Sequence, residues 1–455
     1  MLTNRPPIVV ILGHVDHGKT TLLDALRQTD TASSEAGGIT QTTRAFSASG
    51  ITFIDTPGHE AFFQMRARGG QIADMAMLVV SGTDGVMPQT KESIATIKAA
   101  GIPTIVVVTK ADLPEFNVDK IKAQLAENGV LVEGYGGDVP LVPVSAKIGQ
   151  GLTELVEIIS LVSQLHPSLA DAGGSLEVVV LESLMDTKRG PQAVVIVKNG
   201  TLVLGQSLYL GDRLVGKVRA MTATSGERVI EALPATPVEV VGVTEVLSVG
   251  TVVTSQPGQP IVVASITPRP IKSEGFKLIL KADVAGSVEA VRAALPAGVA
   301  VVLASTGDIS ESDVILAQST DSVVVGFNVR IPTSVAKLAE IDKVKIYTAQ
   351  IIYDLLDKIN LLVHPLEIEK IVGKASVVAE FKIDGQHVAG CKCIEGEIRK
   401  TSQIRWGEKT IRIKSLRLGK IEAESVKVGQ EFGAIFSPVV DFKIGDTIIA
   451  VEVYG

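Results

Sequence analysis

The stretch GHVDHGKT at residues 13–20 has the spacing G-x-x-x-x-G-K-[ST], which joins two glycines to a lysine and a hydroxyl. It follows the apolar run PIVVIL and opens the amphipathic run KTTLLDALR, so a buried strand would lead into it and a helix would leave it. Backbone N–H groups of such a turn bind phosphate oxygens, the lysine reaches the β- and γ-phosphates, and the hydroxyl ligates Mg²⁺. We therefore predict a nucleotide-phosphate site made of Gly13, His14, Val15, Asp16, His17, Gly18, Lys19, Thr20 and Thr21.

Two further stretches would complete the phosphate end of this site. DTPGH at residues 55–59 ends the strand-like run ITFID, and AGGIT at residues 36–40 lies in a polar loop. A loop that closes over Mg²⁺ when a γ-phosphate is present, and opens on hydrolysis, is a known switching device. We predict Thr20, Thr40 and Asp55 as Mg²⁺ ligands and His59 as the catalytic residue that orients the attacking water, with Thr56, Pro57 and Gly58 lining the γ-phosphate.

The base would be recognised by TKAD at residues 109–112, at the carboxyl end of the apolar run PTIVVVT. Asp112 can accept hydrogen bonds from N1–H and the N2 amino group of guanine, whereas adenine presents an acceptor at N1. Losing such a pairing in a buried site costs about 1–3 kcal/mol. We therefore predict selectivity for guanine, with the stem of Lys110 covering the base and backbone N–H groups supplied by Ser145, Ala146 and Lys147.

Thr109 stands where guanine-specific phosphate-loop proteins usually carry asparagine. One interpretation is a shorter substitute whose hydroxyl bonds the phosphate loop but reaches the base poorly. The other is an ordinary threonine at a strand end. Under both interpretations the loop reads guanine, with a weaker tether than asparagine would provide.

The elements that position these residues alternate between strands and helices as far as the breaker stretch HPSLADAGGS. That order predicts a doubly wound α/β domain at residues 1–170. The remaining pattern predicts a multidomain α/β plus β protein. Its further parts would be a β-barrel at 175–268, a small α/β/α domain at 272–341, a connecting helix at 342–366 and a C-terminal β-barrel at 367–455. The connecting helix is inferred from an apolar stripe, Ile352, Leu355, Leu356, Ile359 and Leu362.

Composition indicates a soluble, cytoplasmic protein of several domains. With 455 residues the chain exceeds what one core supports, and 46% hydrophobic residues are typical of globular proteins. Cys391 and Cys393 are too few and too close for a disulfide framework or a zinc site. The start MLTNRPPIVV lacks the pattern of a leader, and no apolar run is long enough to span a bilayer. A net charge of −7 argues against nucleic-acid binding over the whole surface, but leaves room for a local basic patch.

Together, GHVDHGKT, DTPGH, DGVMPQT and SAK resemble the motifs of translational GTPases. Farther along, KLILKADVAGSVEAVRAAL, GDISESDVILAQST, VVVGFNVR and VAGCKCIEGEI are similar to the bacterial translation initiation factor two family. This resemblance implies GTP-dependent recruitment of initiator tRNA to the small ribosomal subunit, promotion of subunit joining, and ribosome-triggered GTP hydrolysis. It implies GTP or GDP and Mg²⁺ as ligands. The family usually carries an extension before the GTPase domain, whereas Met1 stands only a dozen residues before the phosphate loop, so we expect either a minimal member of the family or a shortened chain.

The resemblance also assigns the acceptor end of initiator tRNA to the C-terminal barrel, at Cys391, Arg417, Lys420, Glu431 and Gly433. Three neighbouring positions depart from the family: Leu418 replaces a basic residue, Gly419 an aromatic one and Phe432 a cysteine. The basic segment 399–420 contains the only tryptophan, Trp406, which favours RNA contact over a merely solvated face. We expect tRNA binding through this face and weakened discrimination for the formyl group, because Phe432 adds bulk where a thiol would leave room.

Alternatives are another ribosomal GTPase, such as a selenocysteine-specific elongation factor, and a tRNA-binding scaffold with little turnover. The segment ADVAGSVEAV argues against the first, and the full set Lys19, Thr20, Thr40, Asp55 and His59 argues against the second. Asp112 disfavours an ATP-driven machine. We expect a monomer that contacts ribosomal subunits and RNA, but neither DNA nor membrane.

Overall fold

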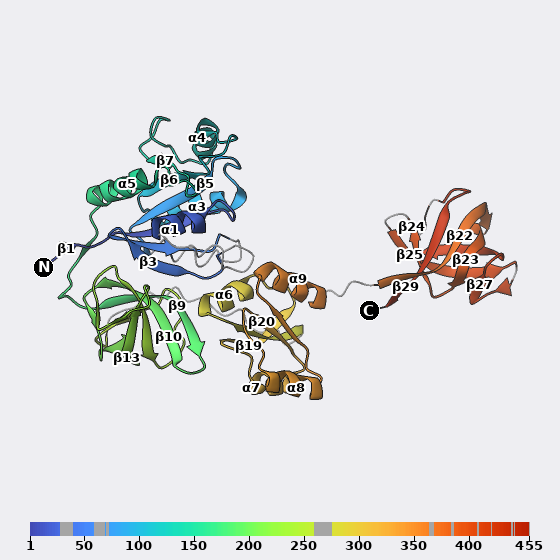
Figure 1. The fold of residues 1–455 in the computed structure, drawn as a ribbon. Coiled ribbons are helices and arrows are strands. Elements are labelled where there is room, and N and C mark those ends of the chain that lie inside the picture. Colours follow the sequence, from blue (N-terminus) through green and yellow to red (C-terminus); the bar gives the residue numbers. More distant parts are fainter. Residues whose placement is uncertain are drawn as a thin grey trace. The chain divides into compact units, whose positions relative to one another are not determined.

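The structure is a computed structural model that describes residues 1–27, 40–58, 69, 72–258, 275–363, 368–383, 386–406, 409–419, 421–437, 440 and 442–454. The chain divides into two compact units, Met1–Ile359 and Asn360–Gly455, whose elements are drawn in Figure 1. Within the described ranges, no helix has both the length and the apolar character needed to cross a membrane.

The first unit begins with a sheet in the strand order β3-β4-β2-β5-β6-β7. All neighbours are parallel except β3, which pairs antiparallel with β4. The strands are β2 (Ile8–Gly13), β3 (Arg44–Ala48), β4 (Ile51–Asp55), β5 (Met75–Ser81), β6 (Thr104–Thr109) and β7 (Leu141–Pro143). β2 and β5 are buried along their whole lengths, which explains their nearly continuous Val, Ile, Leu and Met.

Helices cover both faces of this sheet, and the predicted doubly wound α/β fold is confirmed. They are α1 (Lys19–Arg27), α3 (Pro88–Ala100), α4 (Val118–Glu127) and α5 (Leu152–Leu165). Apolar residues of α3 and α4 pack with one face, whereas those of α1 and α5 pack with the other. Because the central strands are parallel, the residues that end β2, β4, β5 and β6 lie along one edge: Gly13, Asp55, Ser81 and Thr109.

The next part of the first unit is a β-barrel. Its strand order is β12-β17-β9-β10-β16-β13-β14, and an additional pairing of β12 with β13 closes it. The main strands are β9 (Glu177–Asp186), β10 (Gly190–Asn199), β12 (Ser207–Leu210), β13 (Arg213–Ala223), β14 (Arg228–Val229), β16 (Pro237–Val243) and β17 (Val252–Thr254). Valines that alternate along β9, β10 and β16 point inward and form its core.

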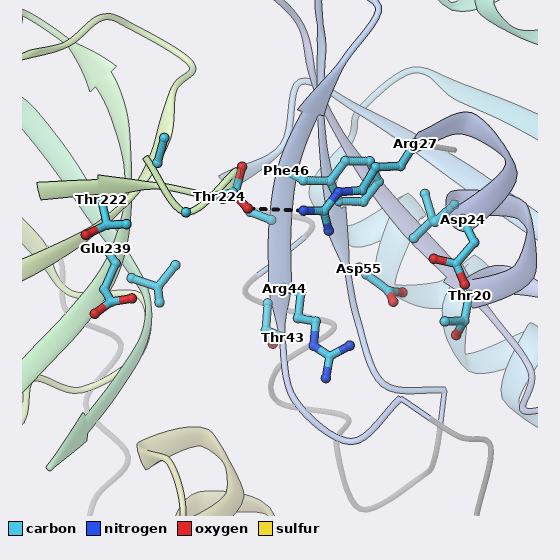
Figure 2. Close-up of a pocket in the computed structure, with 15 residues that line it drawn as sticks. Thr20, Asp24, Arg27, Thr43, Arg44, Phe46, Asp55, Thr222, Thr224 and Glu239 are labelled. Carbon is cyan, nitrogen blue, oxygen red and sulfur yellow. Dashed lines mark hydrogen bonds between the residues drawn. The ribbon is translucent and has the colours of Figure 1, made fainter. Parts of the chain in front are cut away.

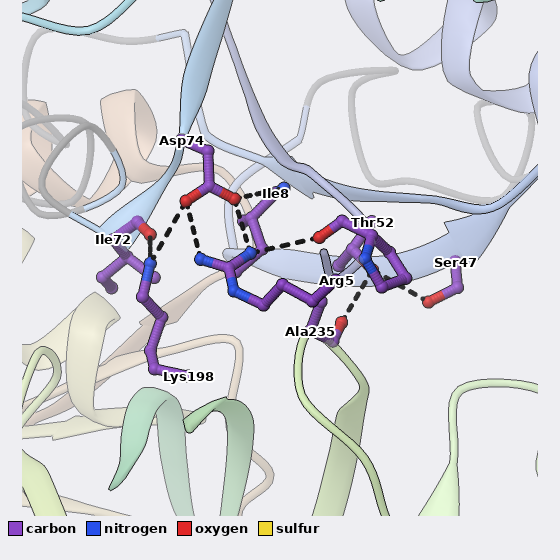
Figure 3. Close-up of polar contacts among 9 residues, drawn as sticks. Arg5, Ile8, Ser47, Thr52, Ile72, Asp74, Lys198 and Ala235 are labelled. Carbon is purple, nitrogen blue, oxygen red and sulfur yellow. Dashed lines mark hydrogen bonds and ion pairs between the residues drawn. The ribbon is translucent and has the colours of Figure 1, made fainter. Parts of the chain in front are cut away.

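A buried polar cluster joins this barrel to the parallel sheet (Figure 3). Arg5 donates two hydrogen bonds to Asp74 over 2.6 and 2.7 Å, and Lys198 of β10 donates to the carbonyl of Ile72 over 2.6 Å. Burial alone would raise the pKa of Asp74, but the bonds from Arg5 and the charge of Lys198 hold it below its usual value. The cluster therefore keeps an ionised carboxylate between the two layers.

The first unit ends in a small α/β layer with parallel strands in the order β19-β18-β20-β21. Its elements are β18 (Phe276–Ala282), α6 (Ala285–Ala293), β19 (Val299–Thr306), α7 (Glu311–Thr320), β20 (Val323–Phe327), α8 (Thr333–Ile341) and β21 (Ile346–Ala349). Helix α9 (Ile352–Val363) begins in this unit, and its last turn belongs to the second unit. The connecting helix predicted over 342–366 is therefore too long. Residues 346–349 are strand β21, because they pair with the otherwise open edge of β20. Of the predicted stripe, Ile352, Leu355 and Ile359 are buried.

The second unit contains a β-barrel with strand order β22-β29-β24-β25-β28-β23-β27, which an additional pairing of β22 with β23 closes. Its strands are β22 (Ile368–Ile383), β23 (Gln386–Arg399), β24 (Gln403–Trp406), β25 (Lys409–Leu418), β26 (Ile421–Glu422), β27 (Ser425–Lys427), β28 (Glu431–Ser437) and β29 (Thr447–Tyr454). Residues that alternate with exposed ones on these strands form its core.

Candidate functional site

The loop between β2 and α1 has the compact geometry expected of a phosphate cradle. Gly13 has φ 154°, and a Cβ there would lie 2.4 Å from the carbonyl oxygen of Val79, so the position requires glycine. Lys19 is 6% exposed, and its Nζ donates to the carbonyls of Gly13 and His14 over 3.1 and 2.7 Å. A Cβ on Gly58 would come within 3.1 Å of the Val15 nitrogen. The turn that ends at Gly58 and the cradle are thus in close contact.

The three predicted metal ligands converge at the end of this loop. The hydroxyls of Thr20 and Thr40 lie 2.7 Å apart, and Thr40 donates to Oδ2 of Asp55 over 3.3 Å. Hydroxyl and carboxylate oxygens are hard ligands of the kind that Mg²⁺ prefers, so the donor set fits this ion. Thr40 and Asp55 are both buried, whereas Thr20 is half-buried.

A cavity of about 360 Å³ lies beside this convergence, between α1, β3 and the barrel strands β13 and β16 (Figure 2). Thr20 and Asp55 line one end, and Thr222 and Glu239 line the other. Arg27 bridges the cavity, because its guanidinium lies 5.3 Å from the ring centroid of Phe46 and donates to the carbonyl of Thr224 over 3.1 Å. The end of α1 is thereby tied to the barrel.

His17 links the cradle to the neighbouring strand. It is 1% exposed, and its Nδ1 accepts a hydrogen bond from the backbone N–H of Ser81 over 3.2 Å. Burial, with a smaller contribution from the charges of His14 and Lys19, lowers the pKa of His17 to about 4. The imidazole is therefore neutral near pH 7, as an acceptor nitrogen requires.

The base-reading loop is held at the same edge of the sheet. The hydroxyl of Thr109 donates to the carbonyl of His17 over 2.7 Å. This is the bond to the phosphate loop that is expected if Thr109 is a shorter substitute for asparagine. The hydroxyl of Ser145 donates to Oδ1 of Asp112 over 2.6 Å and, as the first cause, lowers the pKa of that carboxyl. Ala146 is half-buried and Lys147 exposed on the adjoining turn. The effect of these residues on base affinity stays a prediction.

Two contributing residues were missed by the sequence analysis, and both lie in the DGVMPQT stretch. Asp84 pairs with Nζ of Lys110 over 2.9 Å while Lys110 has the left-handed φ of 64°, so this pair fixes the residue expected to cover the base. The hydrogen bond from Lys110 is the first cause that lowers the pKa of Asp84 to about 2. Gln89 accepts from the N–H of Val15 over 3.0 Å. Only the spacing of this motif could have drawn attention to them.

Some of the predicted residues lie outside the part of the chain that the structure describes. His59 and Lys420 lie outside the described residues, as does the side chain of Trp406. In the second unit, Cys391 is 0% exposed and packs in the core, where burial raises the pKa of its thiol to about 12. Its partner across β23 and β28 is Phe432, which is also buried.

The structure does not bring all of the predicted pocket residues to one surface. Cys391 and Phe432 point into the barrel. Arg417 and Glu431 are exposed on the outer face, and Gly433, which pairs with Arg417, is half-buried. Inward and outward residues alternate along a strand, so these two groups lie on opposite faces of the barrel wall. Phe432 consequently fills core space and takes no room from a ligand on the outer face.

Comparison with known proteins identifies the family. Residues 4–164 match the model of the elongation factor Tu GTP binding domain, 175–256 that of elongation factor G domain 2, and 265–360 that of translation-initiation factor 2. Across 99% of its length the chain is 40% identical to translation initiation factor IF-2 of Alkaliphilus oremlandii and 39% identical to that of Synechocystis. It spans 69% and 50% of these two relatives, respectively. The chain belongs to the translation initiation factor IF-2 family.

A solved structure agrees with this family membership. The crystal structure of GDP-bound aIF5B from Aeropyrum pernix is similar over 98% of this chain and 92% of its own, with 26% identity and a TM-score of 0.50. Members of the IF-2 family are translation initiation factor GTPases, so the chain binds guanine nucleotides and hydrolyses GTP. The multidomain fold expected from the sequence, with its GTPase domain and two barrels, is confirmed.

Proposed function

We propose that this GTPase recruits initiator tRNA to the small ribosomal subunit and promotes subunit joining, and that the assembled ribosome triggers hydrolysis. The observation that carries the switching part of this proposal is the convergence of Thr20, Thr40 and Asp55 at the phosphate loop. Thr40 lies within hydrogen-bond distance of both Thr20 and Asp55. It is therefore suited to change position when the γ-phosphate is gained or lost. The proposed setting is the cytoplasm, with the chain as a monomer that binds neither DNA nor membrane.

Each end of the nucleotide has its own set of residues in this proposal. Thr20, Thr40 and Asp55 would hold Mg²⁺, which when bound neutralises charge on the β- and γ-phosphates. Lys19 and the N–H groups of the loop would bind the phosphate oxygens. Asp112, held by Ser145, would accept from the guanine edge.

His59 stays the proposed catalytic residue. It directly follows Gly58 in the sequence. Gly58 lies against the phosphate cradle, and this supports a place for His59 near the γ-phosphate. Its proposed task is to orient the attacking water. A group that acts on water affects turnover more than binding of the ground state.

Initiator tRNA would bind to the second unit through the outer face of β25. Arg412, Lys414 and Arg417 are exposed on this strand. Arg417 pairs across β28 with Gly433, and Glu431 lies on the same strand as that glycine. Cations that neutralise phosphates release counterions, so affinity should fall as salt is raised. A core position for Cys391 removes it from this surface.

The test measures tRNA binding and subunit joining with matched charge variants. Reversing Arg412, Lys414 and Arg417 to glutamate should weaken initiator tRNA binding by at least tenfold, flatten its salt dependence and slow subunit joining measured by light scattering. GDP affinity should not change. As a control, Lys337, Lys343 and Lys345, three exposed lysines of the first unit, are reversed together. Equal losses in both variants would reject the proposed surface, and joining that proceeds equally well with ATP would reject the function.

A further inference from the structure

The side-chain amide of Gln41 makes two hydrogen bonds to the backbone at the start of helix α9. Its Nε2 donates to the carbonyl of Gln350 over 2.9 Å, 309 residues farther along the chain. Its Oε1 accepts from the N–H of Ile352 over 3.1 Å. A primary amide that donates and accepts in this way fixes both its own orientation and that of the backbone it contacts.

Helix α9 begins directly after a residue whose side chain cannot cap it. The helix starts at Ile352, and the residue before it is Ile351, whose carbonyl accepts from the N–H of Leu355 over 3.3 Å. The first N–H groups of a helix lack partners within the helix, and an isoleucine side chain cannot accept a hydrogen bond. Gln41 therefore supplies, from a distant segment, an acceptor for the first of these N–H groups, that of Ile352.

Gln41 also directly follows Thr40, the switching threonine of the phosphate site. The Thr40 hydroxyl lies 2.7 Å from that of Thr20 and 3.3 Å from Oδ2 of Asp55. One planar peptide unit thus separates a residue of the metal-ligand set from the residue that caps α9. A shift of Thr40 away from Thr20 would also shift the backbone of Gln41 and strain or break the two bonds to α9.

We propose that Gln41 is a positioning residue for Thr40. Its pairing with the start of α9 holds Thr40 beside Thr20 and Asp55, and binding of GTP strengthens that pairing in return. The inference rests on the proposed role of Thr40 at the γ-phosphate and goes beyond it by naming what holds Thr40. Because coupling between two equilibria is reciprocal, each process favours the other by the same factor.

A simple structural tether would behave differently from a positioning residue. A tether lost by mutation would weaken the packing of α9 and change GDP and GTP binding alike. A positioning residue acts only through Thr40, so its loss should lower the affinity for GTP but not the affinity for GDP. The ratio of the two affinities therefore separates the two roles.

The first test is a titration of the whole chain with GDP and with a non-hydrolysable GTP analogue in Mg²⁺. Gln41→Met keeps the length of the side chain but cannot reproduce the paired donor and acceptor. Affinity for the analogue should fall roughly three- to tenfold while GDP affinity stays unchanged. Gln350→Ala is the matched control: it removes an exposed side chain and keeps the carbonyl that Gln41 contacts, so both affinities should be retained. Unchanged or equally changed affinities in Gln41→Met would overturn the proposal.

Hydrogen exchange of the Ile352 amide provides a second readout that does not depend on activity. In the wild type the analogue should slow exchange relative to GDP, and in Gln41→Met this difference should vanish. If the Ile352 amide of the wild type exchanges at the same rate with the analogue and with GDP, the coupling is contradicted.

Thr40→Ala separates failure of the inference from failure of the proposed function. If Thr40→Ala leaves analogue affinity unchanged, the proposed role of Thr40 is wrong and the inference falls with it. If Thr40→Ala weakens analogue binding but Gln41→Met does not, only the positioning role is wrong. The expected result is that the double variant is no weaker than Thr40→Ala alone, because both changes remove the same interaction.

Discussion

The hydroxyl of Ser145 donates a hydrogen bond to the carboxylate of Asp112 over 2.6 Å, across the loops that follow strands β7 and β6. This bond lowers the pKa of Asp112, so the carboxyl is ionised and one of its oxygens is held in place. A fixed carboxylate is what a guanine edge with two donors requires, and it is a poor match to adenine. The relation between these residues therefore underlies the selectivity that we expect.

Asp112→Asn should reverse the base preference. The amide would face the N1–H and N2 donors of guanine with a donor of its own, but it suits the C2 carbonyl of xanthine. GTP affinity should fall about 10- to 100-fold, while xanthosine triphosphate affinity should rise. Competition titration with the two nucleotides measures this, with Ser145→Ala as a milder variant that keeps the carboxylate. Unaltered preference in Asp112→Asn would remove Asp112 from base recognition.

Thr109→Asn should tighten guanine nucleotide binding by about threefold, because an amide reaches farther and can still donate to the carbonyl of His17. Thr109→Val is the matched control, since it keeps the shape and removes the hydroxyl. It should cost about 1 kcal/mol in urea unfolding and loosen nucleotide binding. Weaker binding in Thr109→Asn than in the wild type would show that threonine is not a partial substitute here.

His17 should make the protein less stable in mild acid. The pKa of His17 is about 4 in the folded chain and has its ordinary value of 6.5 in the unfolded chain. Between these two values only the unfolded chain is protonated at His17, so a fall in pH favours unfolding. Lowering the pH from 7 to 5 should therefore cost about 2 kcal/mol through this residue. His17→Asn keeps an acceptor in the position of Nδ1 but does not titrate. Urea unfolding at both pH values should show a smaller acid loss in this variant than in the wild type.

Glu182 should act in the opposite direction. It is 3% exposed on β9, where Oε1 accepts from the N–H groups of Ser183 and of Gly286 at the start of α6. Burial raises its pKa to about 7, so stability is present below pH 4.5 and is lost as the pH rises through 7.

Glu182→Gln removes this titration and keeps an acceptor for both N–H groups. Relative to the wild type, the variant should gain about 2–3 kcal/mol between pH 5 and pH 8 in urea unfolding. A wild type whose pH dependence matches that of the variant would show that Glu182 ionises normally. Because His17 and Glu182 oppose each other between pH 5 and 7, each is measured as a difference from its own variant.

The fold was readable from the sequence wherever one segment carried a strong pattern of its own. Parallel strands such as ITFID and MAMLVV are buried throughout and largely apolar, and α1 begins at the lysine of the phosphate loop as predicted. Strands β3 and β21 were not found, because RAFSA and IYTA are short and become strands only by pairing with distant edges. Such pairing is a tertiary property, which local pattern does not carry.

The candidate site divides in the same way. Residues with a familiar role in a motif were found, whereas Asp84, Gln89 and Gln41 act through contacts with segments that are distant in sequence. The predicted pocket of the second barrel is a different case, because its residues do not all share one face. Ala389, Cys391 and Cys393 alternate with Gly390 and Lys392, and this period of two already indicated that the cysteines face inward. Resemblance to family positions outweighed that signal in the sequence analysis.

GTP hydrolysis with and without ribosomal subunits tests the central claim most directly. Single-turnover release of phosphate is measured with the whole chain alone, with small subunits, and with both subunits. His59→Ala serves as the variant that should bind GTP normally. We predict slow hydrolysis by the chain alone, a large increase only when both subunits are present, and loss of that increase in His59→Ala. A rate that is fast without ribosomes, or that both subunits leave unchanged, would contradict a ribosome-triggered initiation GTPase.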